Sequence, residues 1–134
     1  MVRGVADTHT FIWYLAGDKR LSKPAKAFID ETAGSGDTIA VSSITLVEAL
    51  YLSEKGRIPS TALQQMIQEL HSPDSVFTEI PVDYRIVQVM NQVPWADIPD
   101  MPDRIIAATA ILLDGVVVLS RDAKIQASDI KTLW

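Results

Sequence analysis

The sequence contains no cysteine and only two histidines, His9 and His71. The lack of cysteine excludes a disulfide framework, thiolate metal sites and a cysteine nucleophile, and it fits a reducing compartment. The two histidines are far apart and lack the spacing of a zinc site. No apolar run approaches the ~20 residues that span a bilayer, and the first residues do not resemble a signal peptide. We therefore expect a cytoplasmic protein without a membrane partner.

Basic side chains are also scarce, with 12 Lys and Arg against 17 Asp and Glu and a net charge of −5. This balance argues against a protein that holds nucleic acid by bulk positive charge. The rest of the composition is that of a folded chain, because 134 residues of which 48% are hydrophobic suffice for a sizeable core. We expect one domain over residues 1–134.

Short β-branched runs alternate with longer segments that carry helix start and stop signals. The runs predict strands, at residues 2–6, 38–41, 76–80, 116–119 and 130–133. The segments between them predict helices over residues 8–16, 23–34, 44–55, 61–71 and 84–92. A further helix is predicted to start at Pro102 or Asp103 and to end at residue 113. Such alternation implies βαβ crossovers, so the expected fold class is α/β with a mainly parallel sheet covered on both faces.

Two aspartates stand just after predicted strands, Asp7 immediately and Asp122 at the third residue beyond its strand. Asp7 follows the strand at 2–6, and Asp122 follows the strand at 116–119. Each position also suits a helix N-cap, a common role for Asp between a strand and a helix. Active sites of open α/β sheets lie at the carboxyl ends of the strands, and this rule favours the convergence of Asp7 and Asp122.

Glu48, Asp100 and Asp103 are further candidates. Glu48 is the only charged side chain between residues 38 and 53, so it is either an exposed residue of a mostly covered helix or a buried carboxylate that needs a partner or a cation. Asp100 and Asp103 lie three residues apart where a helix is predicted to begin, and Asp103 suits a cap or a first-turn acid. The strand-end rule does not decide whether these three residues reach the site of Asp7.

If the carboxylates converge, only a few kinds of ligand fit the site that they form. Carboxylates crowded into one cleft repel each other and need a counter-charge. Without Cys or a His pair, the site is made of oxygen ligands, which select Mg²⁺ or Mn²⁺. Such a cation activates water and stabilises charge on a phosphodiester. His9 is expected to be a structural residue of the first helix and not a ligand.

An acidic protein that acts on a polyanion needs local cations and surfaces for bases. Arg104 and Arg121 stand directly beside Asp103 and Asp122, where they could contact phosphates or pair with acids and orient them. A second group of cations either binds the strand or forms a solvated helix face: Lys19, Arg20, Lys23 and Lys26. Aromatic residues that could stack on bases or belong to the core or an interface are Phe11, Trp13, Tyr14 and Trp95.

Four segments together resemble the motifs of the PIN domain, in the order of that family and across essentially the whole chain. The branch that they resemble is the VapC-type toxins of toxin–antitoxin pairs. The segments are Asp7-Thr8-His9-Thr10-Phe11-Ile12-Trp13, Ser42-Ser43-Ile44-Thr45-Leu46-Val47-Glu48, Asp100-Met101-Pro102-Asp103-Arg104-Ile105-Ile106-Ala107-Ala108-Thr109-Ala110 and Leu119-Ser120-Arg121-Asp122.

The resemblance implies a magnesium- or manganese-dependent endoribonuclease on an α/β/α sandwich, a homodimer, and a small antitoxin that inserts a segment into the active-site groove. The acidic quartet of the family, with catalytic and metal-binding roles, maps onto Asp7, Glu48, Asp103 and Asp122. Thr8 and Ser120 match small polar positions near the site. Asp100 matches an additional acidic position, but Ile98-Pro99 replaces the histidine or arginine that commonly precedes it.

Two other classes that begin with a strand ending in Asp fit less well. Haloacid-dehalogenase-like phosphatases have a second Asp two residues on, where this chain has His9. A phospho-receiver domain has an acidic pair after the first strand, and here only Asp7 is present. The alternative that the sequence leaves open is a non-catalytic metal- or RNA-binding module on the same fold.

Overall fold

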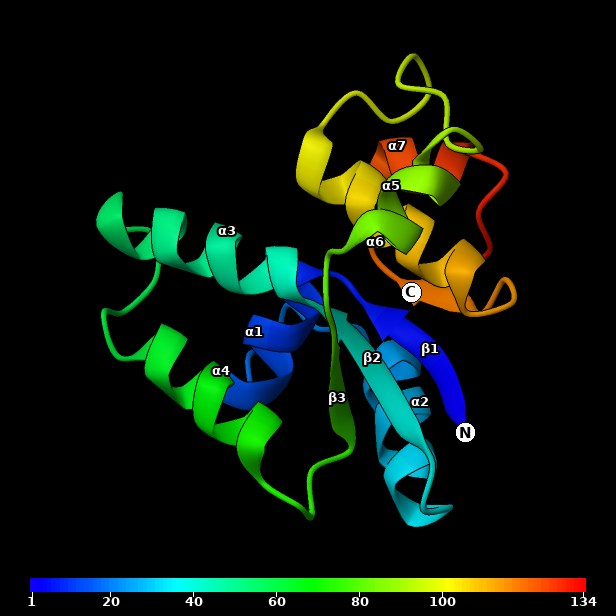
Figure 1. Cartoon of the computed structure of the whole chain (residues 1–134). Helices are drawn as coiled ribbons and strands as arrows, with labels where there is room; N and C mark the ends of the chain where they lie inside the picture. The colour runs from blue at the N-terminus through cyan, green and yellow to red at the C-terminus, as the bar shows by residue number, and fades with distance from the viewer.

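The computed structural model describes residues 1–134 and contains a five-stranded sheet with helices on both faces (Figure 1). The strands are β1 (Val2–Ala6), β2 (Thr38–Ser42), β3 (Phe77–Ile80), β4 (Val117–Leu119) and β5 (Thr132–Leu133). They lie in the order β3-β2-β1-β4-β5, and every neighbouring pair is parallel. The structure therefore confirms the predicted α/β class with a parallel sheet.

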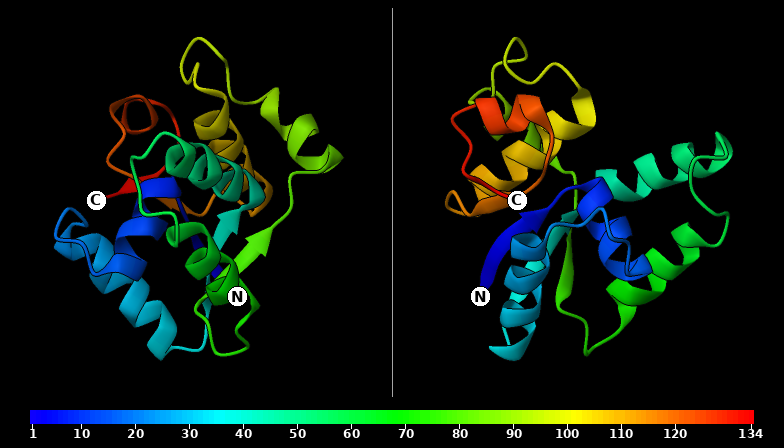
Figure 2. Two further views of the ribbon diagram at one scale, coloured as in Figure 1. Left: turned by 90° about the vertical axis from the view of Figure 1, so that its left-hand side faces the viewer. Right: turned by 180° about the vertical axis from the view of Figure 1, so that it is seen from behind.

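Seven helices connect or follow these strands. They are α1 (Thr8–Ala16), α2 (Lys23–Gly34), α3 (Ser43–Glu54), α4 (Ala62–His71), α5 (Tyr84–Met90), α6 (Met101–Leu112) and α7 (Ala123–Ala127). Figure 2 shows α3 and α4 extending together beyond the sheet on one side of the molecule. None of the seven helices is long and apolar enough to cross a membrane.

The sheet divides the buried side chains into two cores, because successive strand residues point to opposite faces. Ala6 and Leu119 pack in the core that the sheet forms with α1, α2, α3 and α4. Val5 and Val118, their neighbours in the chain, pack in the core formed with α5, α6 and α7. Strands buried on both faces explain why these segments of the sequence are continuously apolar and do not alternate with polar residues.

The strand order places a crevice between β1 and β4. From β1 the chain adds β2 and then β3 on one side of the sheet, and it returns to the other side of β1 to add β4 and β5. This reversal is the topological switch point at which open α/β sheets bind their ligands, outside the carboxyl ends of the strands. Residues that follow β1 and β4 therefore meet at this crevice.

Three helices begin at residues other than those predicted. Helix α3 was predicted from residue 44 and begins at Ser43, because β2 runs directly into it and the Ser42 hydroxyl caps it by accepting from the Ile44 amide at 3.2 Å. Helix α4 begins one residue late, after Thr61, which makes no side-chain cap. Helix α6 begins at Met101, because Asp100 is its N-cap.

Gly4→Ala is expected to lower the free energy of unfolding by about 1–3 kcal/mol. A Cβ atom at residue 4 would lie 3.0 Å from the carbonyl oxygen of Val117 and 3.2 Å from the ring of Phe28. The carbonyl belongs to the paired strand β4, so relief of the clash disturbs the β1–β4 ladder. Chemical denaturation measures the effect. Gly34→Ala is the matched control, since its Cβ would meet no atom within 4 Å, and equal stability of the two variants would contradict the prediction.

Candidate active site

Asp7 and Asp122 meet at the crevice between β1 and β4. The Asp7 amide donates to the carbonyl of Leu119, the last residue of β4, at 3.2 Å. The Thr10 hydroxyl donates to the same carbonyl at 2.8 Å, which ties the first turn of α1 to the end of β4. Asp7 is 8% exposed. The strand-end rule therefore brings both aspartates to one place, as predicted.

Both aspartates are also helix caps. One oxygen of Asp7, Oδ1, accepts from the Thr10 amide at 2.9 Å. The Oδ1 atom of Asp122 accepts from the amides of Lys124 and Ile125 at 2.9 and 3.0 Å. In each carboxylate the second oxygen makes no hydrogen bond within the protein. The cap role is therefore present in both residues, and it leaves one carboxylate oxygen of each free for a ligand.

Glu48 is held at the site by Thr8. The Thr8 hydroxyl, in the first turn of α1, donates to Oε1 of Glu48, and it lies 3.1 Å from the hydroxyl of Thr45. Burial raises the pKa of the Glu48 carboxyl; the Thr8 hydrogen bond lowers it, and the negative charges of Asp100 and Asp7 raise it. Glu48 is thus a half-buried carboxylate facing other acids, and it is not an exposed residue on the outer face of α3.

Asp100 and Asp103 enter the site from the N-terminus of α6, which points toward the carboxyl ends of the strands. Asp100 is exposed and caps the helix, since its Oδ1 accepts from the Asp103 amide at 3.0 Å. Asp103 is half-buried, and the pKa of its carboxyl is raised from 3.8 to about 7, first by burial and then by the negative charges of the four other acids, Asp100, Asp122, Glu48 and Asp7. Asp103 therefore lies within electrostatic reach of the four other carboxylates.

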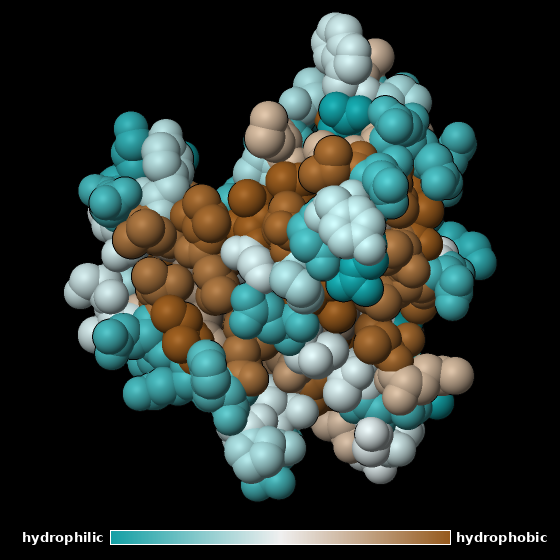
Figure 3. Space-filling model, in the orientation of Figure 1, coloured by the Kyte–Doolittle hydropathy of each residue, from teal (hydrophilic) through white to brown (hydrophobic).

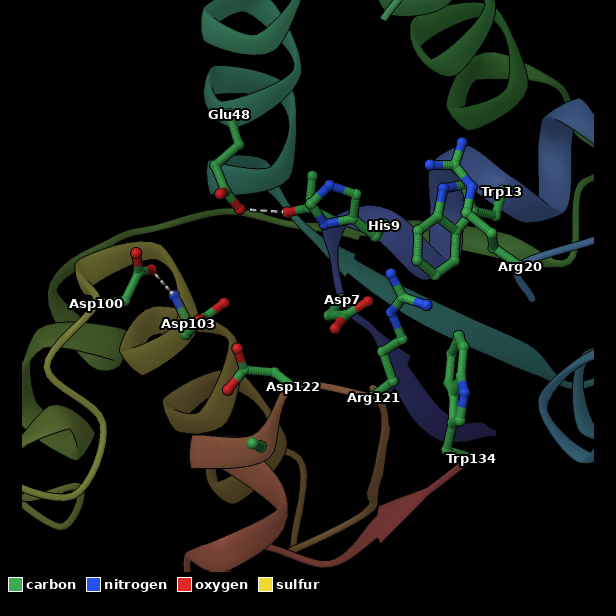
Figure 4. Close-up of a pocket in the computed structure, with 12 residues that line it drawn as sticks. Asp7, His9, Trp13, Arg20, Glu48, Asp100, Asp103, Arg121, Asp122 and Trp134 are labelled. Atoms are coloured by element: carbon green, nitrogen blue, oxygen red, sulfur yellow. Dashed lines mark hydrogen bonds between the residues drawn. The ribbon is translucent and has the colours of Figure 1, made fainter. Parts of the chain in front are cut away.

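The five carboxylates line one cavity of about 520 Å³ (Figure 4). As the side chains stand, no three of the acids and histidines are arranged to hold a metal ion. The donor set nevertheless fits a hard cation, because it consists of carboxylate oxygens of which several are free and mutually repelling. The residues that could hold such a cation after side-chain rotation are Asp7, Glu48, Asp100, Asp103 and Asp122.

The opposite wall of this cavity is aromatic and basic. Its centre is Trp13, only 3% exposed, whose ring is contacted by the guanidinium carbons of Arg121 at 4.5 Å and Arg20 at 4.9 Å. The rings of His9 and Trp134 lie 5.3 and 5.9 Å from the Trp13 ring, measured between centroids. Figure 4 shows this wall across the cavity from Glu48, Asp100, Asp103 and Asp122, with Asp7 between the two sides.

Trp134 and His9 of this wall were not predicted as site residues. Trp134 directly follows β5, so the strand-end rule applied to the last strand would have found it. His9 lies one helical turn before Trp13 on the same face of α1. It was expected to be a structural residue of this helix, but its side chain is exposed and lines the cavity. Arg20 was considered only as a member of a lysine- and arginine-rich segment.

The remaining predicted residues have supporting or separate places. The Ser120 hydroxyl is fully buried and accepts from the Asp122 amide at 3.0 Å, so it orients Asp122 from below the cavity. Arg104 does not line the cavity: its guanidinium donates to the carbonyls of Val93 at 2.7 Å and Met90 at 3.0 Å. The prediction that Arg104 contacts substrate or neighbouring acids therefore has no support in the structure, because both donors stabilise the end of α5 and the loop after it.

Comparisons with known proteins agree with this architecture. The family model of the PIN domain matches residues 5–131. No match was found among curated proteins. Among solved structures, VapBC2 from Rickettsia felis, bound to a DNA fragment from its promoter, has a TM-score of 0.69 at 16% identity, over 100% of this chain and 98% of that chain.

Two further solved structures are similar over nearly their whole length. A toxin–antitoxin complex from Klebsiella pneumoniae has a TM-score of 0.69 at 22% identity, covering 98% of this chain and 96% of that chain. FitAcB from Neisseria gonorrhoeae has a TM-score of 0.63 at 19% identity, with the same coverage of 98% and 96%. At these identities the likeness demonstrates a shared fold.

Proposed function

The chain belongs to the PIN domain family, and from this premise we propose that it is a Mg²⁺- or Mn²⁺-dependent endoribonuclease that hydrolyses RNA phosphodiester bonds with water. We further propose that it acts as the toxin of a toxin–antitoxin pair. Proteins of this family are generally nucleases, and the solved structures that resemble this chain include toxin–antitoxin complexes. We also propose that this activity takes place in the cytoplasm.

The observation that carries the proposal is the gathering of five carboxylates from four separate segments around one cavity at the topological switch point. Crowded carboxylates destabilise a fold unless a counter-charge relieves their repulsion. The pKa of Asp103 is raised to about 7 chiefly by burial and further by this repulsion. A protein that had no use for a cation at this place would be expected to scatter these acids over its surface.

The proposed roles of the residues follow from their contacts. Asp7, Glu48, Asp103 and Asp122 would hold the cation, with Asp100 at the rim of the cavity. When bound, a divalent cation of this kind lowers the pKa of a coordinated water and stabilises negative charge on a phosphodiester. The Thr8 hydroxyl holds Glu48 in place, and Ser120 and the helix amides hold Asp122. These contacts keep the carboxylates of Glu48 and Asp122 at the cavity.

Removal of divalent metal is the direct test of this function. Purified chain, free of antitoxin, is expected to cleave RNA with Mg²⁺ or Mn²⁺ and to lose cleavage in EDTA, with recovery when metal is restored. Gel analysis of end-labelled RNAs of varied structure measures the products. No cleavage of any RNA at saturating metal, from a chain whose fold is intact by circular dichroism, would favour the alternative, a metal- or RNA-binding module that does not cleave.

The surface supports the proposed protein partners, a second copy of the chain and a small antitoxin. Figure 3 shows apolar side chains gathered across one face of the molecule, where α3 and α5 lie in Figure 1. Val47 and Leu50 of α3 are 59% and 47% exposed, and Val87 of α5 is 61% exposed. Apolar surface of this kind marks protein interaction sites. The complexes from Klebsiella pneumoniae and Rickettsia felis provide the precedent of a partner.

A further inference from the structure

The aromatic and basic wall of the cavity contains one guanidinium that has no acceptor. Arg20 donates from Nε and a terminal nitrogen to the two carboxylate oxygens of Asp18, at 3.1 and 2.8 Å. Arg121 makes no hydrogen bond and no ion pair, although Asp7 and Asp122 line the same cavity. Its guanidinium instead lies on the ring of Trp13, at 4.5 Å from the centroid.

This arrangement leaves the N–H donors of Arg121 available to a ligand, because they are not paired with the carboxylates of the cavity. Contact with the ring face stabilises the cation by attraction to the ring's negative face, and it leaves the in-plane N–H groups free. Trp13 is almost fully buried in the core that lies between the sheet and α1 to α4, so the platform is rigid. A planar fork of unpaired N–H donors matches the geometry of a phosphate group.

An aromatic ring stands beside this guanidinium. Trp134 is partly exposed, lines the cavity, and is tilted by 59° to the Trp13 ring. Figure 4 shows it next to Arg121, on the side of the cavity away from Glu48 and Asp100. Partly exposed aromatic rings next to cations are the surfaces on which proteins stack the bases of single-stranded nucleic acid.

We propose that Arg121 and Trp134 form a subsite for the nucleotide next to the cleaved bond, with Arg121 binding its phosphate and Trp134 stacking on its base. This inference rests on the proposed function in one respect, which is that the cleaved bond lies at the carboxylates. Binding at the subsite itself requires no metal and no cleavage. The subsite also explains how a chain with net charge −5 holds a polyanion: its carboxylates and its phosphate-binding guanidinium lie on opposite sides of one cavity.

Binding of a short fluorescein-labelled single-stranded RNA, followed by fluorescence anisotropy in EDTA, tests the subsite. Arg121→Gln is expected to weaken binding about tenfold and to reduce the slope of log affinity against log salt by about 0.7, the value for one phosphate contact on a single strand. Arg121→Lys should keep the slope but bind more weakly, because it retains the charge and loses the planar fork.

A second variant separates stacking from charge. Trp134→Leu keeps apolar volume in the cavity wall and is expected to weaken binding about tenfold while the salt slope stays unchanged. Arg57→Gln is the matched control for Arg121→Gln, since Arg57 is exposed, has no ion pair and lies outside the cavity. It should change neither affinity nor slope beyond the error of the measurement. Melting temperatures of all variants verify that the fold is retained.

The outcomes distinguish this subsite from the proposed nuclease activity. If the parent chain cleaves RNA but Arg121→Gln binds RNA with unchanged affinity and salt slope, the subsite is wrong and the nuclease stands. If the parent never cleaves but Arg121→Gln and Trp134→Leu weaken binding as described, the subsite is supported and the chain is an RNA-binding module that does not cleave. Absence of RNA binding by the parent in EDTA, and by Asp7→Asn in Mg²⁺, would overturn the subsite.

Discussion

Asp7→Asn is expected to lower the rate of RNA cleavage in Mg²⁺ by about 10²–10³-fold and to leave the fold intact. The oxygen of the asparagine side chain can still accept from the Thr10 amide, which Asp7 does now at 2.9 Å, and Asn is as good an N-cap as Asp. The substitution replaces the other, unpaired oxygen by an NH₂ group, which can neither ligate a cation nor contribute negative charge. Initial cleavage rates of end-labelled RNA measure the effect.

Asp83→Asn is the matched control for this prediction. Asp83 also caps its helix, α5, with Oδ1 accepting from the Arg85 amide at 3.0 Å, but its carboxylate is paired with the Arg85 guanidinium and does not line the cavity. Its replacement is expected to leave cleavage unchanged. Cleavage by Asp7→Asn at the rate of the parent would show that Asp7 acts only as a cap, and it would remove the main support for a site at the end of β1.

Asp103→Asn is expected to raise the thermal stability of the metal-free chain at pH 8, with a melting temperature higher by on the order of 5 °C. The shift of the Asp103 pKa to about 7 corresponds to at most about 4 kcal/mol, and solvent screening at this half-buried carboxyl reduces it to about 1–2 kcal/mol. Loss of a favourable first-turn acid opposes part of the gain. Differential scanning calorimetry in EDTA measures the melting temperature.

The difference between the two proteins should depend on pH. The folded chain holds the Asp103 proton up to about pH 7, whereas the unfolded chain loses it near the ordinary pKa of 3.8. The folded state therefore binds more protons between these values, and the stability of the parent falls as pH rises through this window. Below it, Asp103 is protonated in both states and Asp103→Asn has no advantage. The raised pKa of Glu48 acts in the same direction in both proteins.

Magnesium provides the second half of this test. A cation that binds only the assembled site raises the melting temperature of the parent, and Asp103→Asn should gain less because it has lost one ligand. Asp74→Asn removes an equal charge from an exposed loop outside the cavity, and it should behave as the parent does. A clear fall in the melting temperature of Asp103→Asn in EDTA at pH 8 would mean that this carboxylate is structural.

Most of the fold could be predicted from local sequence, because its signals are local. Five apolar runs became five strands, and Gly17, which has a positive φ of 63°, ends α1 where the pattern indicated. The exact starts of α3 and α6 were less predictable. Ser42 and Ser43 both suit a cap, as do Asp100 and Asp103, and the choice depends on how the preceding strand or loop enters the helix.

The candidate site was predictable in part. The strand-end rule identified Asp7 and Asp122 because sheet topology places such residues together whatever their side chains. The same reasoning could not place Glu48 or Asp103, since a helix residue reaches a site only if the helix is rotated and docked correctly. The position of Arg104 beside Asp103 suggested that it contacts phosphates or pairs with acids, but in the structure its guanidinium donates to two backbone carbonyls outside the cavity.

The sequence by itself determined the class of the fold and the edge of the sheet at which Asp7 and Asp122 lie. It also determined that any ligand set built from these acids consists of oxygen atoms. These depend on composition and on hydrophobic periodicity, which are properties of neighbouring residues. Only the tertiary structure decided that Thr8 binds Glu48, that Asp103 is half-buried near four other carboxylates, and that Arg121 lies on Trp13. The physical reason is that charge repulsion, burial and ring contacts depend on distances between residues far apart in the chain. A scarcity of basic residues, which argued against a nucleic-acid partner, was a statement about the average charge, whereas binding depends on where each charge lies.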